Sequence, residues 1–226
     1  SARRREEAEW VQEQIEEGNR KQRVKQDKDL AEVVAATFDR GELYLYWAPG
    51  RDLGVPGEDV ASGLLQSPAV QTGRLKSITI YGVYDAQTTI TPLIEIFPQI
   101  LAKTPLESVF IGDCQIGDSG VTNLCGALRA ASRLSSLDLT LTGMRDEGAV
   151  AVAELISENK AIKSVTLHAN RIAKRGLEAL LASLDSNELV TTLKVEGSSS
   201  PELAKAIKTK LQDPERSDRA LLAALM

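Results

Sequence analysis

A six-residue pattern of apolar side chains recurs along the chain at a fixed interval. Its first, fourth and sixth positions are apolar, and four copies begin at Leu106, Leu134, Ile162 and Val190, each 28 residues after the one before. A fifth copy begins at Leu75, 31 residues before the first of these. A repeat of this length is one structural unit, and such units stack into a solenoid that shares a continuous core.

Each unit is expected to combine a short strand with a helix. The fourth and sixth positions are two residues apart, so on a strand they point to one face. Cys114 and Asn170, with Thr142 as a weaker substitute, stand eight residues after their starts, where they are expected to satisfy backbone groups of the turn. Apolar residues then recur at helical spacing. A glycine that suits a tight helix entry precedes them, at Gly120, Gly148 and Gly176.

The segment Leu134 to Asn159, LSSLDLTLTGMRDEGAVAVAELISEN, resembles the leucine-rich repeats of ribonuclease-inhibitor type. The resemblance covers residues 75–197. It implies an α/β fold, a leucine-rich-repeat solenoid with a curved parallel sheet and outer helices, in about five to six repeats. A protein-binding role is what such a solenoid implies, because its concave sheet carries side chains that the core does not need.

Both ends of the chain depart from the pattern. Residues 1–36 are predicted to form a charged helical segment, and residues 37–74 a degenerate capping repeat that includes the alternating Leu43-Tyr-Leu-Tyr-Trp47. Residues 198–226 are predicted to be C-terminal capping helices that cover the open hydrophobic end of the stack. The N-terminal helix either docks on the first repeat or is bound by a partner through Trp10, Val11 and Ile15.

Composition limits the partners and the compartment. With 27 basic and 32 acidic residues the formal net charge is -5, which argues against nucleic acid. No apolar run is long enough to span a membrane. Cys114 and Cys125 fall at core positions, so buried thiols in a reducing, cytoplasmic environment are expected. Because the sequence begins with Ser, the alternative that an organellar targeting segment has been removed is kept.

The sequence contains no assembled catalytic, cofactor or metal motif. The single histidine, His168, is predicted at an outward strand position, where neighbouring repeats place Thr140 and Glu196. Catalysis by serine and histidine needs a nucleophile and an orienting acid around it, and a polar sheet surface explains these residues more simply. We therefore expect a non-catalytic protein with no cofactor.

The best candidate for a partner-binding site lies on the concave sheet. Tyr81 and Phe110 are outward-facing aromatic residues that the core pattern does not require, and aromatic side chains ringed by polar groups are favoured at protein interfaces. The predicted site comprises Tyr81, Phe110, Asp113, Asp138, Leu141 and His168. The alternative is that the N-terminal segment folds across this patch.

Three hypotheses about function remain. The first is a protein-interaction module, such as a scaffold or assembly subunit of an intracellular complex. The second is a cytoskeletal protein, because about five short repeats followed by an amphipathic C-terminal helix look like the C-terminal half of tropomodulin, a region that binds actin in that family. The third is a GTPase regulator, although the helix-entry turns with Arg145 and Arg175 do not single out an arginine finger.

Overall fold

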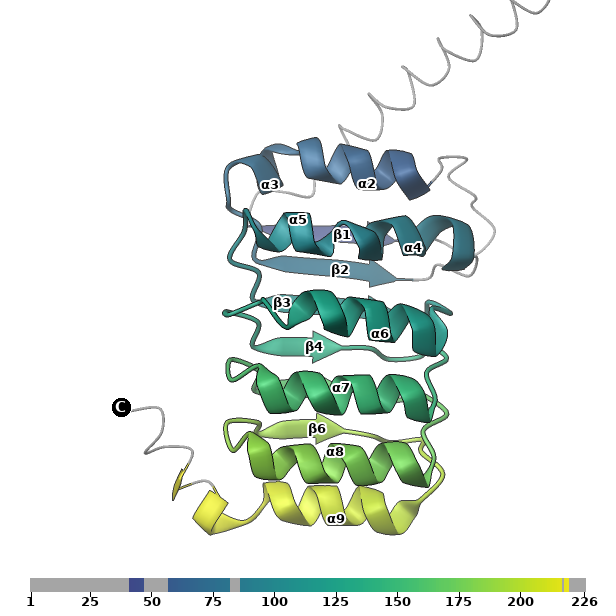
Figure 1. The fold of residues 1–226 in the computed structure, drawn as a ribbon, viewed down its shortest axis with the longest axis vertical. Helices are drawn as coiled ribbons and strands as arrows, with labels where there is room; N and C mark the ends of the chain where they lie inside the picture. The colour runs from purple at the N-terminus through teal and green to yellow at the C-terminus, as the bar shows by residue number, and fades with distance from the viewer. Residues whose placement is uncertain (1–40, 47–56, 82–85, 217, 220–226) are drawn as a thin grey trace, which may run out of the picture.

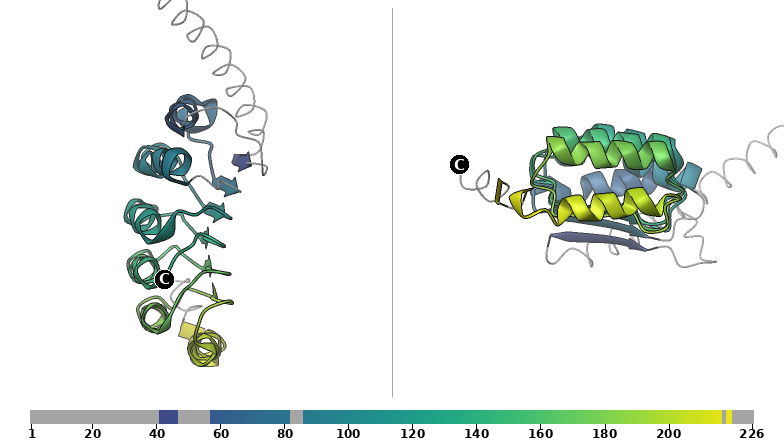
Figure 2. Two further views of the ribbon diagram at one scale, coloured as in Figure 1. Left: turned by 90° about the vertical axis from the view of Figure 1, so that its right-hand side faces the viewer. Right: turned by 90° about the horizontal axis from the view of Figure 1, so that it is seen from below.

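The computed structural model describes residues 41–46, 57–81, 86–216 and 218–219 of the 226. Within these residues six strands form one parallel sheet in the order β1-β2-β3-β4-β5-β6, and every sequential pair of strands is adjacent. The helices stack over one face of that sheet (Figure 1), and the helix over Pro201–Leu211 lies at the far end of the stack, shifted towards the strands (Figure 2). The predicted α/β leucine-rich-repeat solenoid is confirmed.

The strands are three to five residues long. They are β1 (Glu42–Tyr46), β2 (Ser77–Tyr81), β3 (Ser108–Gly112), β4 (Ser136–Asp138), β5 (Ser164–Thr166) and β6 (Thr192–Lys194). The described helices are α2 (Gly57–Gln66), α3 (Pro68–Gln71), α4 (Ala86–Glu95), α5 (Phe97–Leu101), α6 (Gly117–Leu128), α7 (Asp146–Glu158), α8 (Lys174–Ser186) and α9 (Pro201–Leu211).

Figure 2 separates the layer of helices from the layer of strands. The side of the sheet turned away from the helices is the open face. Between the two layers lies the core, which contains the apolar side chains at the first, fourth and sixth positions of all five repeats, none more than 6% exposed. No helix in the described ranges is long and apolar enough to cross a bilayer.

Asn170 shows what the polar position after each strand does. Its side chain is buried; Oδ1 accepts from the backbone N–H groups of Thr142 and Met144 at 3.1 and 3.2 Å, and Nδ2 donates to the carbonyls of Leu139 and Leu167. One amide therefore links the turns of two repeats. Such a network is worth most when every buried group in it is satisfied.

An aspartate of one repeat caps the helix of the next. Asp118 Oδ1 accepts from the N–H groups of Arg145 and Gly148, and Asp146 Oδ1 does the same for the following helix. These carboxylates satisfy amide groups that the first turn of a helix leaves unpaired. A Cβ on Gly148 would lie 2.8 Å from Asp118 Oδ1. It would also lie 2.8 Å from Met144 Cγ at the entry of the same helix, so the glycine leaves room both for the tight entry and for the neighbouring carboxylate.

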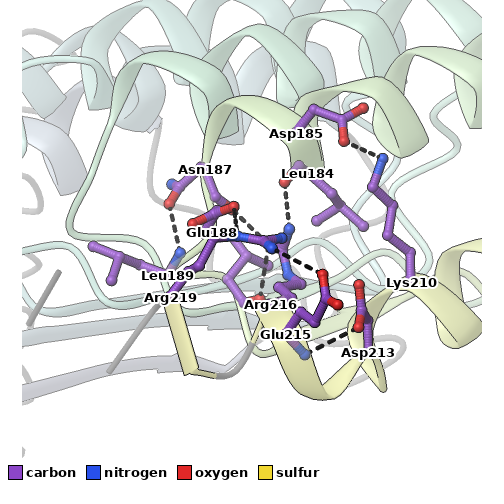
Figure 3. Close-up of polar contacts among 11 residues, drawn as sticks. Leu184, Asp185, Asn187, Glu188, Leu189, Lys210, Asp213, Glu215, Arg216 and Arg219 are labelled. Atoms are coloured by element: carbon purple, nitrogen blue, oxygen red, sulfur yellow. Dashed lines mark hydrogen bonds and ion pairs between the residues drawn. The ribbon is translucent and has the colours of Figure 1, made fainter. Parts of the chain in front are cut away.

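A second ladder of polar side chains follows the helices. Asn159 Nδ2 donates to the carbonyls of Leu128 and Ala131 in the preceding repeat, and Asn187 repeats this one unit later. At the end of the stack Arg216 occupies the corresponding place (Figure 3). Its guanidinium donates to the Leu184 carbonyl and, at 2.6 and 3.2 Å, to the carbonyls of Asn187 and Val190. A charged side chain therefore covers the last repeat where a further asparagine would extend the ladder.

Candidate functional site

Successive strands bring the outward-facing residues of the open face into rows. The register pairs Tyr44 with Thr79, Thr79 with Phe110, and Phe110 with Asp138. At the next outward-facing position, two residues closer to the carboxyl ends of the strands, Tyr81 pairs with Gly112. The structure therefore brings together four of the predicted residues, Tyr81, Phe110, Asp113 and Asp138, on neighbouring strands and the turns that follow them.

The rings of Tyr81 and Phe110 are stacked, with their centroids 6.2 Å apart and their planes 27° from parallel. Both side chains are partly exposed. Stacking of this kind contributes about 0.5–1.5 kcal/mol beyond the burial of area, and it holds two large side chains in fixed positions. An aromatic surface that is already ordered loses little entropy when a partner binds.

Gly112 explains where the Phe110 ring lies. A Cβ added to Gly112 would come within 2.6 Å of two ring carbons of Phe110 and 3.2 Å of the Tyr81 ring. The Phe110 ring therefore covers the glycine backbone and leans towards the carboxyl end of β3. Covering a glycine in a sheet is a structural role, so Phe110 serves the strand as well as the surface.

Leu141 follows β4 in a left-handed backbone conformation with φ of 56°. The residue is 40% exposed, which is unusual among the large apolar residues that the structure describes. Asp113 and Ala169 adopt the same conformation at the equivalent place, with φ of 52° and 55°, and Gly197 has φ of 90°. The turn requires this backbone, and a leucine there carries a strain of roughly 1 kcal/mol that glycine would avoid.

Polar residues continue the open face beyond the aromatic pair. Asp138 Oδ1 accepts from both the N–H and the hydroxyl of Thr140, at 2.9 and 2.6 Å. His168 Nδ1 lies 3.8 Å from Glu196 Oε2, and both side chains are more than half exposed. The strand prediction for His168 was wrong in detail, because β5 ends at Thr166 and His168 lies in the turn beyond it.

Sequence reasoning missed Tyr44, which is 48% exposed on β1. Its hydroxyl donates to Glu42 Oε2 at 2.8 Å, and this hydrogen bond raises the pKa of the Tyr44 phenol above its ordinary value. The signal was present, since Leu43 and Leu45 alternate with it as buried residues. Applying the outward-facing positions to the degenerate first repeat would have added Tyr44 to the site.

Burial and spacing determine the chemistry of two kinds of side chain among the described residues. Burial raises the pKa of the Cys125 thiol to about 12, so this cysteine is a protonated core residue. In the ranges that the structure covers, no group of three or more His, Cys, Asp or Glu side chains is placed to hold a metal ion. Trp10, Val11 and Ile15, the other predicted contact residues, lie outside the described residues.

Comparisons with known proteins agree with the fold. A family model described as "Leucine Rich repeat" matches residues 102–125 and 133–153. Tropomodulin-4 from Bos taurus is 33% identical over 76 residues, which is 34% of this chain and 22% of that protein. Leucine-rich repeat-containing protein 45 from Gallus gallus is 31% identical over 107 residues, 44% of this chain and 16% of that protein. The chain therefore spans less than a quarter of the length of these relatives.

Two solved structures are also similar. Leiomodin-1 actin-binding site 2 aligns with a TM-score of 0.50 at 12% identity, covering 69% of this chain and 91% of that one. The tropomodulin C-terminal domain from Caenorhabditis elegans aligns with a TM-score of 0.41 at 14% identity, covering 60% of this chain and 98% of that one. The likeness to the leiomodin segment is one of fold.

Proposed function

We propose that this leucine-rich-repeat protein is a non-catalytic interaction module, a scaffold or assembly subunit, that binds a protein partner through the open face of its sheet. The observation that carries the proposal is the ordered aromatic pair, Tyr81 stacked on Phe110 and partly exposed. Neither ring is needed to fill the core between sheet and helices. Exposed Leu141 and Tyr44 extend the apolar surface, and Asp113 and Asp138 supply polar groups near it.

The test is capture of partners from the native source by the full chain, with Tyr81→Ala and Phe110→Ala combined in one variant. We expect the main partner to be lost from the variant, because truncating central aromatic anchors removes the largest contributions to an interface. Ser119→Ala, an exposed position on α6 in the layer of helices, is the matched control, since it lies away from the open face.

Phe110→Ala also uncovers Gly112, so the fold of the variant needs its own check. Circular dichroism and the thermal midpoint serve this purpose. Phe110→Leu is the second variant, because leucine still covers the glycine backbone but removes the ring. An unchanged set of captured partners from a folded double variant would contradict the proposal.

A second candidate is actin binding. Two observations favour it: the sequence similarity to tropomodulin-4 over 76 residues, and a fold shared with a leiomodin-1 segment that is named as an actin-binding site. Growth of actin filaments at their pointed ends, with the barbed ends blocked, tests it directly. Slower growth with increasing protein supports a cytoskeletal role, and unchanged growth at a large excess of protein rules out capping.

The hypothesis of a GTPase regulator gains no comparable support. Arg175 Nη1 is paired with Glu147 Oε1 at 2.8 Å across adjacent helices. The backbone N–H of Arg145 is bound by Asp118, where it belongs to the cap of α7. Both turns are explained by the contacts between repeats.

A further inference from the structure

The open face carries a row of side chains along the carboxyl ends of its strands, from β2 to β6. Tyr81 pairs with Gly112, which the Phe110 ring covers. Backbone hydrogen bonds of 2.9–3.0 Å continue the row, from Asp113 to Thr140, from Leu141 to His168 and from Ala169 to Glu196. The sheet-edge row consists of Tyr81, Phe110, Leu141, His168 and Glu196.

The character of the sheet-edge row changes along its length. Its first three members are two stacked rings and an exposed leucine. Its last two are His168 and Glu196, whose side chains are 54% and 63% exposed. An occupant that matches this row needs apolar groups over the first three strands and a positive charge near Glu196.

The spacing of the row distinguishes a helix from an extended peptide. Neighbouring strands lie about 4.8 Å apart, and one turn of an α-helix advances about 5.4 Å. A helix lying across the strands therefore places about one side chain on each strand. An extended peptide presents side chains to one face every ~7 Å and falls out of step after two strands.

From these observations the geometry points to an amphipathic α-helix of a partner protein, lying across the strands along the sheet-edge row. The helix carries apolar residues at i, i+4 and i+7 over Tyr81, Phe110 and Leu141, and a Lys or Arg about two turns further on, near Glu196. This inference rests on the proposed function and specifies the partner of the same face.

Charge argues against the protein's own N-terminal segment as the occupant. Trp10, Val11 and Ile15 are surrounded by six acidic residues between Glu6 and Glu17. Docking that segment on the row would bring its carboxylates towards Asp138 and Glu196. Like charges in close contact are unfavourable, and a basic helix meets the opposite sign.

The test selects binders of the full chain from two displayed libraries, one of randomised helices and one of randomised extended hairpins. We expect the enriched helices to show the i, i+4, i+7 apolar pattern followed by Lys or Arg. Their binding is expected to fall at least about tenfold with Tyr81→Ala and with Leu141→Gly. Ser119→Ala, an exposed position on α6, is the matched control.

A charge exchange supplies the sharpest readout. Glu196→Lys is expected to weaken binding of the selected helix to the chain. Replacing the basic residue of that helix with Glu is then expected to restore binding. Binders of the row that come from the hairpin library, or helices indifferent to Glu196→Lys, would overturn the inference. So would displacement of the helices by a peptide of residues 1–36, or dimerisation that Leu141→Gly abolishes. Each of these outcomes leaves the partner-capture test of the open face intact.

Discussion

Replacing Arg216 with methionine tests how the solenoid ends. Arg216 is 4% exposed, and its guanidinium donates to three carbonyls, those of Leu184, Asn187 and Val190. Burial also lowers the pKa of this side chain. Methionine keeps a similar length but has no donor, so Arg216→Met leaves three buried acceptors without this partner.

The size of the effect follows from those three contacts. A hydrogen bond from a charged donor contributes roughly 1.5–3 kcal/mol. Release of the buried cation offsets a large part of the loss, because its desolvation was costly. We expect a net destabilisation of about 3 kcal/mol, which corresponds to a fall of roughly 6–12 °C in Tm for a chain of this size.

Urea unfolding and hydrogen exchange measure this prediction together. Because repeats interact only with their neighbours, the amides of α8, β6 and α9 are expected to lose protection before those of α6. Arg219→Met is the matched control, since it removes a nearby arginine whose contacts with Glu188 and Glu215 are at the surface. Arg216→Met with unchanged stability and unchanged exchange in α8 and α9 would refute the role of Arg216 as the end of the ladder.

Three further predictions concern single residues. Ala131→Asn is expected to stabilise the chain by about 1 kcal/mol, as measured by urea unfolding. Ala131 occupies the position of Asn159 and Asn187 in later repeats, and it lines a cavity of about 90 Å³. A loss of stability would contradict this prediction. Leu141→Gly is expected to leave the free energy of unfolding within about 0.5 kcal/mol of its original value, since relief of left-handed strain offsets the flexibility of glycine, while partner capture weakens. Cys125, with its pKa raised to about 12, is expected to resist alkylation at pH 8 until the protein unfolds. Mass spectrometry of the alkylated protein measures this, and rapid labelling of Cys125 in the native protein would contradict the prediction.

The repeat itself could be predicted because each strand follows a local pattern. Apolar residues at fixed positions define β3 to β6, and the role of Asn170 follows from the turn that it enters. The capping of α7 by Asp118 could not be predicted in the same way, because it links positions 27 and 30 residues apart. That contact also supplies one of two reasons for Gly148, and the other is the close approach of Met144 within the same repeat.

The candidate site was less predictable than the fold for a related reason. Alternation along a strand identifies Tyr81 and Phe110 as outward-facing, but it does not say where a ring leans. Gly112 decides that, because its missing side chain leaves space for the Phe110 ring beside Tyr81. Arg216 was overlooked because a charged residue in the C-terminal segment is normally expected at the surface. In the structure it is buried.

The contacts that hold the stack together leave the sheet-edge row available for recognition. Asn170, Asp118 and Asn159 each bind backbone groups of a neighbouring repeat, so changes at those positions disturb the fold. Tyr81 and Leu141 contribute exposed surface and are not part of these hydrogen-bond ladders. Phe110 is more closely tied to the strand, since its ring would meet a Cβ on Gly112 at 2.6 Å whereas the Tyr81 ring would lie 3.2 Å away. Variants at Tyr81 and Leu141 therefore separate partner binding from stability more cleanly than variants at Phe110, and a loss of binding there without a loss of stability is evidence for recognition.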